Sequence, residues 1–514
     1  MCHCRLMPSV LLLVVAALVV SCLGCGQRAD SVSWAGWPTE DWPVSTPEEQ
    51  GMDSGLLADL VEKVAGDEGI DSVLVIRNGY LVVDAVVYPF PKDTSHVLAS
   101  CTKSVVGTLV GMAIDRGLLA GVDVPVVEIL ADDAPETVDD LKASMTVEDL
   151  LTMSTGLECR DSYLYDWEGM QAMVASDNWV AHVLALPMSE EPSARFEYCN
   201  GSSMLLSAIL SEVTGMSAGD FAAEVLFEPL GISDYEWPAS PRGVTIGMGG
   251  LRLGPDDLAK LGLLYLREGR WEGEQLVPQR WVEDSTTPQI EAGTLSDRYG
   301  YQWWVDDSGY VMALGAGGQY LIVVPDQRLI VVFTAGLPGE RFSLPEELTQ
   351  QYVLPAILSD DPLPPAAAAA ARHAATVSKT GSAPEPTEVV MPPIAAAIDG
   401  ARYELRPNDS GFEACRISFT SDTVQIEAEF DDVSLAFEPR LDGRYVMFED
   451  PAGGLSAIRA AWQGDDTLVF EMRTPGEVAR QKWQMTFDES TVHIEMSDPS
   501  DERVLIHYTA DRVE

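Results

Sequence analysis

Leu98-Ala99-Ser100-Cys101-Thr102-Lys103-Ser104 decides the fold, because it places a hydroxyl nucleophile and an amine one helical turn apart. A run with helical periodicity, 103–115, begins there and is ended by Gly117. Residues i and i+3 share a helix face, so the Lys103 ammonium can reach the oxygen of Ser100. The helix N-terminus supplies backbone N–H groups for a developing oxyanion. The spacing therefore indicates acyl-transfer chemistry.

Lys103 needs a particular environment to act as a base, because a lysine in water stays protonated at neutral pH. Burial lowers the pKa of such an amine, and the neutral form can then take the serine proton. Ser-x-x-Lys alone arises often by chance in a chain of 514 residues. Other parts of the sequence therefore have to show whether Ser100 and Lys103 belong to a catalytic site.

Tyr198-Cys199-Asn200 follows an extended segment and precedes the helical run 203–213, so its polar side chains lie at a junction between elements. Catalytic residues are common at such junctions. A tyrosine phenol near a lysine ammonium can have a lowered pKa and act as general base or acid for Ser100. Asn200 can orient Lys103 and donate to an acyl amide. We expect these four side chains to form one catalytic site.

Further motifs occur along the chain in the order typical of one enzyme superfamily. They are Leu150-Leu151-Thr152-Met153-Ser154-Thr155-Gly156-Leu157, Phe196-Glu197-Tyr198-Cys199-Asn200, Leu226-Phe227-Glu228-Pro229-Leu230-Gly231-Ile232, Tyr299-Gly300-Tyr301-Gln302-Trp303-Trp304 and Gly315-Ala316-Gly317-Gly318-Gln319-Tyr320. With Ser-x-x-Lys, they make the chain resemble the serine β-lactamase and penicillin-recognising superfamily over roughly 45–355. The resemblance is to its class C-like branch of esterases, D-aminopeptidases and 6-aminohexanoate-dimer hydrolases.

The resemblance implies an α+β fold, in which an antiparallel sheet carries a helical subdomain. It implies Ser100 as the acylated nucleophile, Lys103 as its activator, Tyr198 as proton shuttle and Asn200 as support. It implies no cofactor and no metal. The expected partner is a small-molecule or peptide-like ester or amide substrate.

One departure from the superfamily bears on the substrate. Its third motif, Lys or His followed by Thr, Ser or Gly and then Gly, would fall near Tyr310-Val311-Met312-Ala313, where no cation stands. Because that cation helps to bind a substrate carboxylate, its loss disfavours penicillins and D-Ala-D-Ala peptides and favours neutral esters or amides. The backbone N–H of Ala313 can still complete the oxyanion hole with that of Ser100.

Three other motif matches fail on context. Gly215-Met216-Ser217-Ala218-Gly219 fits G-x-S-x-G, but a helix and not a strand precedes it, so Gly215 is expected to end one helix and Ser217 to cap the next. Lys379-Thr380-Gly381 lies in an Ala/Pro-rich segment, and Ser176-Asp177-Asn178 is simplest as a helix cap. His96 precedes Ser100 by four residues without an evident triad.

Aromatic residues cluster at Tyr301, Trp303 and Trp304, where they either line an apolar pocket or pack in the core.

The N-terminus predicts export. Arg5 precedes an apolar stretch, Val10–Val20, which is too short to span a membrane. Small residues before a cysteine resemble the cleavage site of bacterial lipoproteins, and the pattern fits Cys22 better than Cys25. We therefore expect a lipoprotein-type signal over 1–25, a tether over 26–45, and a lipid anchor at Cys22 that holds the protein in the bacterial cell envelope.

Charge and the remaining cysteines narrow the class further. With 81 acidic against 32 basic residues, the net charge of −49 repels nucleic acid and anionic lipid surfaces, and we expect no nucleic-acid partner. Cys101, Cys159, Cys199 and Cys415 are scattered without C-x-x-C pairs. They indicate neither a zinc site nor a disulfide framework, and we expect them to be buried thiols.

The chain divides into two parts. Strand-like runs 73–76 and 81–83 flank an Asn-Gly turn, and 320–324 and 329–334 form a second apolar hairpin, so one sheet should combine distant segments. A hydrolase domain is expected over 46–358 and an Ala/Pro-rich linker over 359–394. Alternating apolar residues over 395–514 predict an all-β, barrel-like accessory domain.

The sequence thus predicts an exported serine hydrolase that cleaves an ester or amide through a Ser100 acyl-enzyme, with Lys103 and Tyr198 as proton-transfer partners. A non-hydrolytic penicillin-binding-like receptor or sensor is one alternative. A β-lactamase or D-Ala-D-Ala carboxypeptidase is another. The sequence does not name the acyl group, the leaving group, the oligomeric state or the role of the C-terminal domain.

Overall fold

The computed structural model describes residues 34–513, apart from 93, 162–166, 294, 432, 450–453, 489 and 499–503. The expected signal segment, Cys22 and the first part of the expected tether lie outside this range. Within the range, no helix combines the length and apolar character that crossing a membrane requires.

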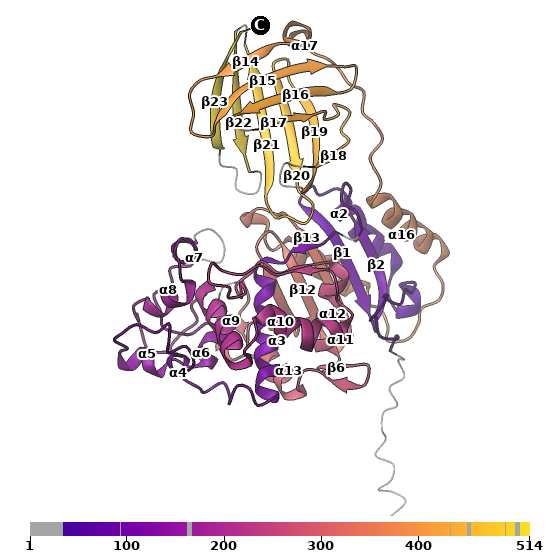
Figure 1. The fold of residues 1–514 in the computed structure, drawn as a ribbon. Coiled ribbons are helices and arrows are strands. Elements are labelled where there is room, and N and C mark those ends of the chain that lie inside the picture. The colour runs from indigo at the N-terminus through magenta and orange to yellow at the C-terminus, as the bar shows by residue number, and fades with distance from the viewer. Residues whose placement is uncertain are drawn as a thin grey trace, which may run out of the picture.

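An antiparallel sheet of eight strands forms the centre of the first domain (Figure 1). Its order is β2 (Tyr80–Val86), β1 (Ile70–Arg77), β13 (Leu329–Ala335), β12 (Gln319–Val324), β11 (Val311–Gly315), β10 (Trp304–Val305), β9 (Arg298–Tyr299) and β8 (Ile290–Glu291). Asn78 and Gly79 both have positive φ and turn the chain from β1 into β2. Val73 of β1 lies opposite Phe333 of β13, which confirms that one sheet joins distant segments.

Some helices pack against this sheet, and others form the expected helical subdomain beside it (Figure 1). The longer ones are α2 (Ser54–Ala65), α3 (Thr102–Asp115), α9 (Asn200–Thr214) and α12 (Pro255–Leu266). Shorter ones are α4 (Val126–Ile129), α5 (Asp140–Ser144), α6 (Val147–Leu151), α7 (Glu168–Val174), α8 (Trp179–Ala185), α10 (Ala218–Ala222), α11 (Glu228–Leu230), α13 (Gln279–Thr286), α14 (Leu344–Leu348) and α15 (Leu354–Ala356). Because α3 packs against both α9 and β11, its first turn lies where the subdomain meets the sheet.

Two segments expected to be spacers contact the first domain. Alanines favour helix, and those at 366–371 belong largely to α16 (Ala367–Thr380), which packs against α2. In the described part of the expected tether, the rings of Trp34 and Trp37 lie under the guanidinium of Arg267, at 4.2 and 4.6 Å.

The C-terminal domain is a curved antiparallel sheet of ten strands that nearly closes into a barrel (Figure 1), as predicted. A short helix, α17 (Pro393–Ile398), precedes it. The strands are β14 (Arg402–Leu405), β15 (Phe412–Phe419), β16 (Val424–Phe430), β17 (Ser434–Phe437), β18 (Val446–Glu449), β19 (Leu455–Gln463), β20 (Thr467–Arg473), β21 (Arg480–Phe487), β22 (Thr491–Ser497) and β23 (Val504–Arg512). Alternate side chains of β16 and β22 point into its core, as their sequence pattern predicts.

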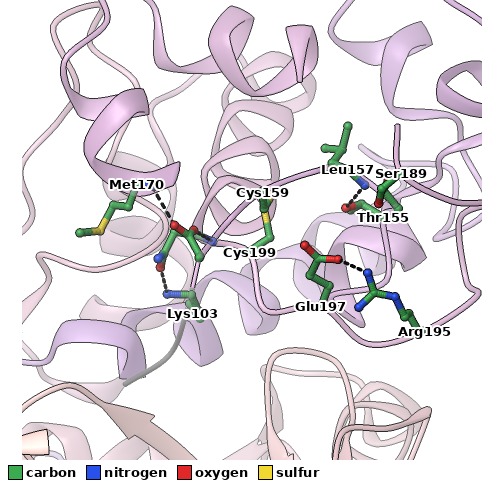
Figure 2. The surroundings of a disulfide bond; sticks show 12 residues. Lys103, Thr155, Leu157, Cys159, Met170, Ser189, Arg195, Glu197 and Cys199 are labelled. Carbon is green, nitrogen blue, oxygen red and sulfur yellow. Dashed lines mark hydrogen bonds and ion pairs between the residues drawn. A yellow bond between two sulfur atoms is a disulfide. The ribbon is translucent and has the colours of Figure 1, made fainter. Parts of the chain in front are cut away.

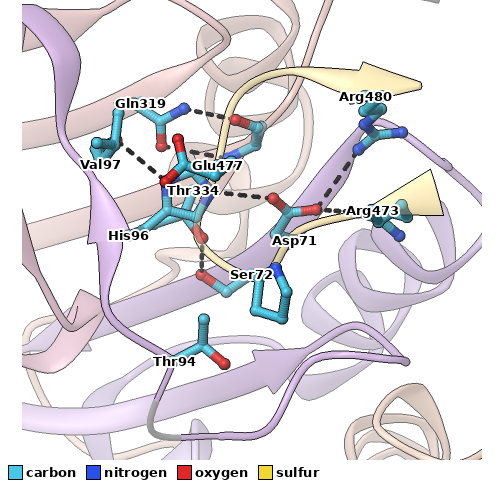
Figure 3. A network of polar contacts seen from close by, with 12 residues as sticks. Asp71, Ser72, Thr94, His96, Val97, Gln319, Thr334, Arg473, Glu477 and Arg480 are labelled. Atoms are coloured by element: carbon cyan, nitrogen blue, oxygen red, sulfur yellow. Dashed lines mark hydrogen bonds and ion pairs between the residues drawn. The ribbon is translucent and has the colours of Figure 1, made fainter. Parts of the chain in front are cut away.

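The turn between β20 and β21 docks onto the first domain beside the nucleophile segment (Figure 3). The carboxylate of Asp71, in β1, forms ion pairs with Arg473 and, at 3.5 Å, with Arg480. Its second oxygen lies 3.0 Å from Nε2 of His96, in β3 (His96–Val97). The N–H of Val97 donates to the carbonyl of Gly476 at 2.8 Å. The C-terminal barrel therefore contacts the first domain at Val97, three residues before Ser100.

Replacing Asp71 with asparagine is expected to lower the thermal unfolding midpoint by about 5 °C, because the change leaves the buried Arg473 guanidinium without its carboxylate. Differential scanning fluorimetry measures this shift. Asp511→Asn is the control, because its pair with Arg406 is exposed on the barrel and is expected to matter little. Equal shifts in the two variants would contradict a structural role for the buried pair.

Candidate active site

Ser100 lies in a tight 3₁₀ turn, Ala99–Cys101, that leads directly into α3. Ala99 has φ of 45°, an uncommon conformation for a residue with a side chain. The end of β11 approaches this turn closely, since a Cβ on Gly315 would lie 2.3 Å from the carbonyl oxygen of Leu98. The turn and the strand end thus hold the serine where helix and sheet meet.

The side chain of Lys103 reaches Ser100, as predicted from their i, i+3 spacing on a helix. Its Nζ lies 2.9 Å from Oγ of Ser100, 2.8 Å from Oδ1 of Asn200 and 2.6 Å from the carbonyl oxygen of Met248. The side chain is buried. Burial lowers the pKa of Lys103 to about 7, against an opposing influence from Asp161 and Cys101. A substantial fraction of the amine is therefore neutral at physiological pH.

Tyr198 also contacts the nucleophile, because its hydroxyl donates to Oγ of Ser100 at 2.9 Å. Its ring stacks on Trp304 with centroids 6.2 Å apart. The expectation of a lowered tyrosine pKa is wrong: burial raises the pKa of Tyr198, and this outweighs the hydrogen bond to Ser100. The phenol therefore stays protonated and is suited to donate a proton.

Asn200 begins α9 and is buried. Its Oδ1 accepts from Lys103, and its side-chain amide interacts with the carboxylate of Asp161. Donation by this amide to a bound acyl group stays a prediction.

The structure also locates the predicted oxyanion residue. Ala313 lies in the middle of β11, opposite Leu321 of β12, while Gly315 is the β11 residue that approaches the Ser100 turn. No charged residue occurs in β11, in line with the missing cation. The role of Ala313 stays a prediction.

A disulfide joins Cys159 to Cys199 (Figure 2), so the expectation that both are free thiols is wrong. The two residues are 40 positions apart and their Cα atoms are 5.6 Å apart, a proximity that sequence spacing cannot show. Cys101 and Cys415 are buried and free, as expected. Among the residues that the structure describes, no group of three or more His, Cys, Asp or Glu could hold a metal ion.

The remaining candidates have structural roles. Asn178 caps α8, and Ser217 caps α10 after Gly215 ends α9. Trp303 and Tyr301 pack in the core. His96 contacts Asp71 and not the nucleophile.

The chain is similar to known proteins in sequence and in fold. A sequence profile of the beta-lactamase family matches residues 57–353. The 6-aminohexanoate-dimer hydrolase of Paenarthrobacter ureafaciens is 25% identical over 290 residues, which cover 52% of this chain and 73% of that protein. A solved structure from Bacillus anthracis, proposed to be a 6-aminohexanoate-dimer hydrolase, has a TM-score of 0.51 at 19% identity and covers 62% of this chain and 89% of its own. The octameric penicillin-binding protein homologue from Pyrococcus abyssi has a TM-score of 0.47 at 18% identity and covers 88% of this chain and 99% of its own.

The chain belongs to the beta-lactamase family, since the profile match spans more than half of it. The named relative from Paenarthrobacter ureafaciens is a hydrolase.

Proposed function

We propose that this protein hydrolyses an ester or amide through an acyl-enzyme on Ser100. The observation that carries the proposal is the convergence of two proton-transfer groups on one oxygen: Nζ of Lys103 and the hydroxyl of Tyr198 each lie 2.9 Å from Oγ of Ser100. Such a pair can both deprotonate a nucleophile and protonate a leaving group.

The proposed cycle uses these groups in turn. Neutral Lys103 takes the proton of Ser100 while Oγ attacks the substrate carbonyl, and backbone N–H groups of Ser100 and β11, predicted at Ala313, stabilise the oxyanion. Tyr198 donates its proton to the leaving group as the C–O or C–N bond breaks, and regains one from the Lys103 ammonium. Water then attacks the acyl-enzyme and gives a proton to neutral Lys103. The C–Oγ bond breaks, Oγ of Ser100 takes a proton back from the Lys103 ammonium, and the acid is released.

The substrate is proposed to be a neutral ester or amide. β11 offers no cation to bind a carboxylate, which disfavours penicillins and D-Ala-D-Ala peptides. The similarity to a 6-aminohexanoate-dimer hydrolase supports a linear amide or a related ester. We further propose export and anchoring through Cys22, supported by the N-terminal sequence and by a disulfide, which persists in oxidising compartments.

A substrate panel tests this function. Purified protein is expected to turn over the neutral ester p-nitrophenyl butyrate at least about tenfold faster, in kcat/KM, than nitrocefin or a D-Ala-D-Ala peptide, because an unpaired carboxylate costs about 1.4 kcal/mol or more. Faster nitrocefin hydrolysis would identify a β-lactamase instead.

The pH dependence of kcat/KM tests whether Lys103 is the general base. Lys103 acts in its neutral form, and its pKa is lowered to about 7. Activity is therefore expected to rise about tenfold per pH unit below pH 7 and to level off above it. A profile that is flat from about pH 5 to 9 would exclude Lys103 as the base.

A further inference from the structure

Asp161 is next to the catalytic group, although none of the described hydrogen bonds joins it to Ser100 or Tyr198. Its Oδ2 accepts the main-chain N–H of Asn200, the first residue of α9, at 2.9 Å. Its Oδ1 accepts the N–H of Met170 in α7 at 2.8 Å. One carboxylate thus joins the N-termini of two helices, where negative charge is favourable.

The Cys159–Cys199 disulfide connects the same two segments covalently (Figure 2). Cys199 stands between Tyr198 and Asn200, and Cys159 precedes Asp161 by two residues. The backbone is tightly packed here, because a Cβ on Gly169 of α7 would lie 1.7 Å from the carbonyl oxygen of Cys159. The disulfide and the carboxylate therefore fix one another's position.

Asp161 also acts on Lys103 through its charge. Burial raises the pKa of Asp161, while the N–H groups of Asn200 and Met170, the side chain of Asn200 and the charge of Lys103 oppose that shift. In return, Asp161 and the thiol of Cys101 favour the charged form of Lys103. Tyr198, which directly precedes Cys199, also faces Lys103: its ring centroid is 5.1 Å from Nζ. Without Asp161, burial would lower the pKa of the amine further.

We propose that Asp161 is a positioning residue of the hydrolase site: it is held in place by the Cys159–Cys199 disulfide, and it orients Asn200 toward Lys103. This inference rests on the proposed function. It assigns the disulfide to catalysis as well as to stability.

The test compares Asp161→Asn, Asp161→Glu and the double variant Cys159→Ser/Cys199→Ser with wild type. In Asp161→Asn, the acidic limb of the kcat/KM profile is expected to move about one unit to lower pH, with kcat about tenfold lower and KM changed less than about threefold. Asp161→Glu keeps the negative charge, so the acidic limb of its kcat/KM profile is expected to lie at nearly the same pH as in wild type. The double cysteine variant is expected to shift the limb as Asp161→Asn does.

Cys415→Ser is the matched control, because it removes a buried thiol from the barrel and is expected to leave the profile unchanged. An acidic limb that stays in place in Asp161→Asn would overturn the proposal. So would wild-type kcat in the double cysteine variant, measured well below its unfolding midpoint.

A second readout keeps this inference separate from the proposed function. The Lys103 ammonium is titrated by NMR in protein labelled with ¹³C at lysine Cε, with Lys103→Arg to assign its signal. A lower Lys103 pKa in Asp161→Asn supports the electrostatic role even if wild type hydrolyses no substrate tried, whereas an unchanged pKa overturns that role.

Discussion

Ser100→Ala is expected to lower kcat/KM for p-nitrophenyl ester hydrolysis by about 10⁴-fold or more, because it removes the atom that forms the acyl-enzyme. Oγ of Ser100 is the shared hydrogen-bond acceptor of Lys103 and Tyr198, so its loss leaves both proton-transfer groups without the nucleophile that they contact. Initial rates over a range of substrate concentrations measure the effect.

Ser217→Ala serves as its control. Ser217 caps α10, outside the catalytic group, and its loss should leave kcat/KM unchanged. Retention of a tenth or more of wild-type activity in folded Ser100→Ala, above the level expected from binding alone, would remove Ser100 from the mechanism.

Lys103→Arg is expected to lower kcat/KM by about 10³-fold, because a guanidinium keeps the positive charge but cannot accept the serine proton at any working pH. The loss should fall mainly on kcat. Stopped-flow measurement of acylation with a p-nitrophenyl ester separates this step from substrate binding.

Lys142→Arg controls for replacement of a buried lysine, since Nζ of Lys142 donates to two backbone carbonyls, those of Leu184 and Leu186. Its kcat/KM should stay within about threefold of wild type. Equal losses in the two variants would mean that the Lys103 effect is structural.

Local patterns made much of the fold predictable. The Asn-Gly turn between β1 and β2 and the caps of α8 and α10 depend on residues a few positions apart, and the structure has them as predicted. The contact between Ser100 and Lys103 is local in the same sense, because one helical turn joins them. Tyr198 and Asn200 are distant in sequence from Ser100, and their place in the same site was predicted from their position at a junction between elements and from the family resemblance.

The rest of the site depends on contacts that no local pattern shows. Met248 contributes a backbone carbonyl to Lys103, and a carbonyl leaves no signature in the side-chain sequence. Asp161 and the Cys159–Cys199 disulfide meet the site only through the folded chain. The pKa of Tyr198 was misjudged because its depth of burial, which outweighs its polar neighbours, is a property of the packed core.

The barrel contributes to this region too. Its β20–β21 turn is fastened to Asp71 and Val97, close to the Ser100 turn (Figure 3). A distant part of the sequence therefore supports the nucleophile segment. Composition alone separated this domain from the first but did not predict that contact.

Intact-mass spectrometry after exposure to a fluorophosphonate probe tests the central claim most directly. Wild type is expected to gain the mass of one phosphonyl group, located on Ser100 by peptide mapping, and Ser100→Ala to gain none. Labelling of another residue, or no labelling of the folded wild type, would contradict a Ser100 nucleophile and favour a binding protein that keeps the fold without the chemistry.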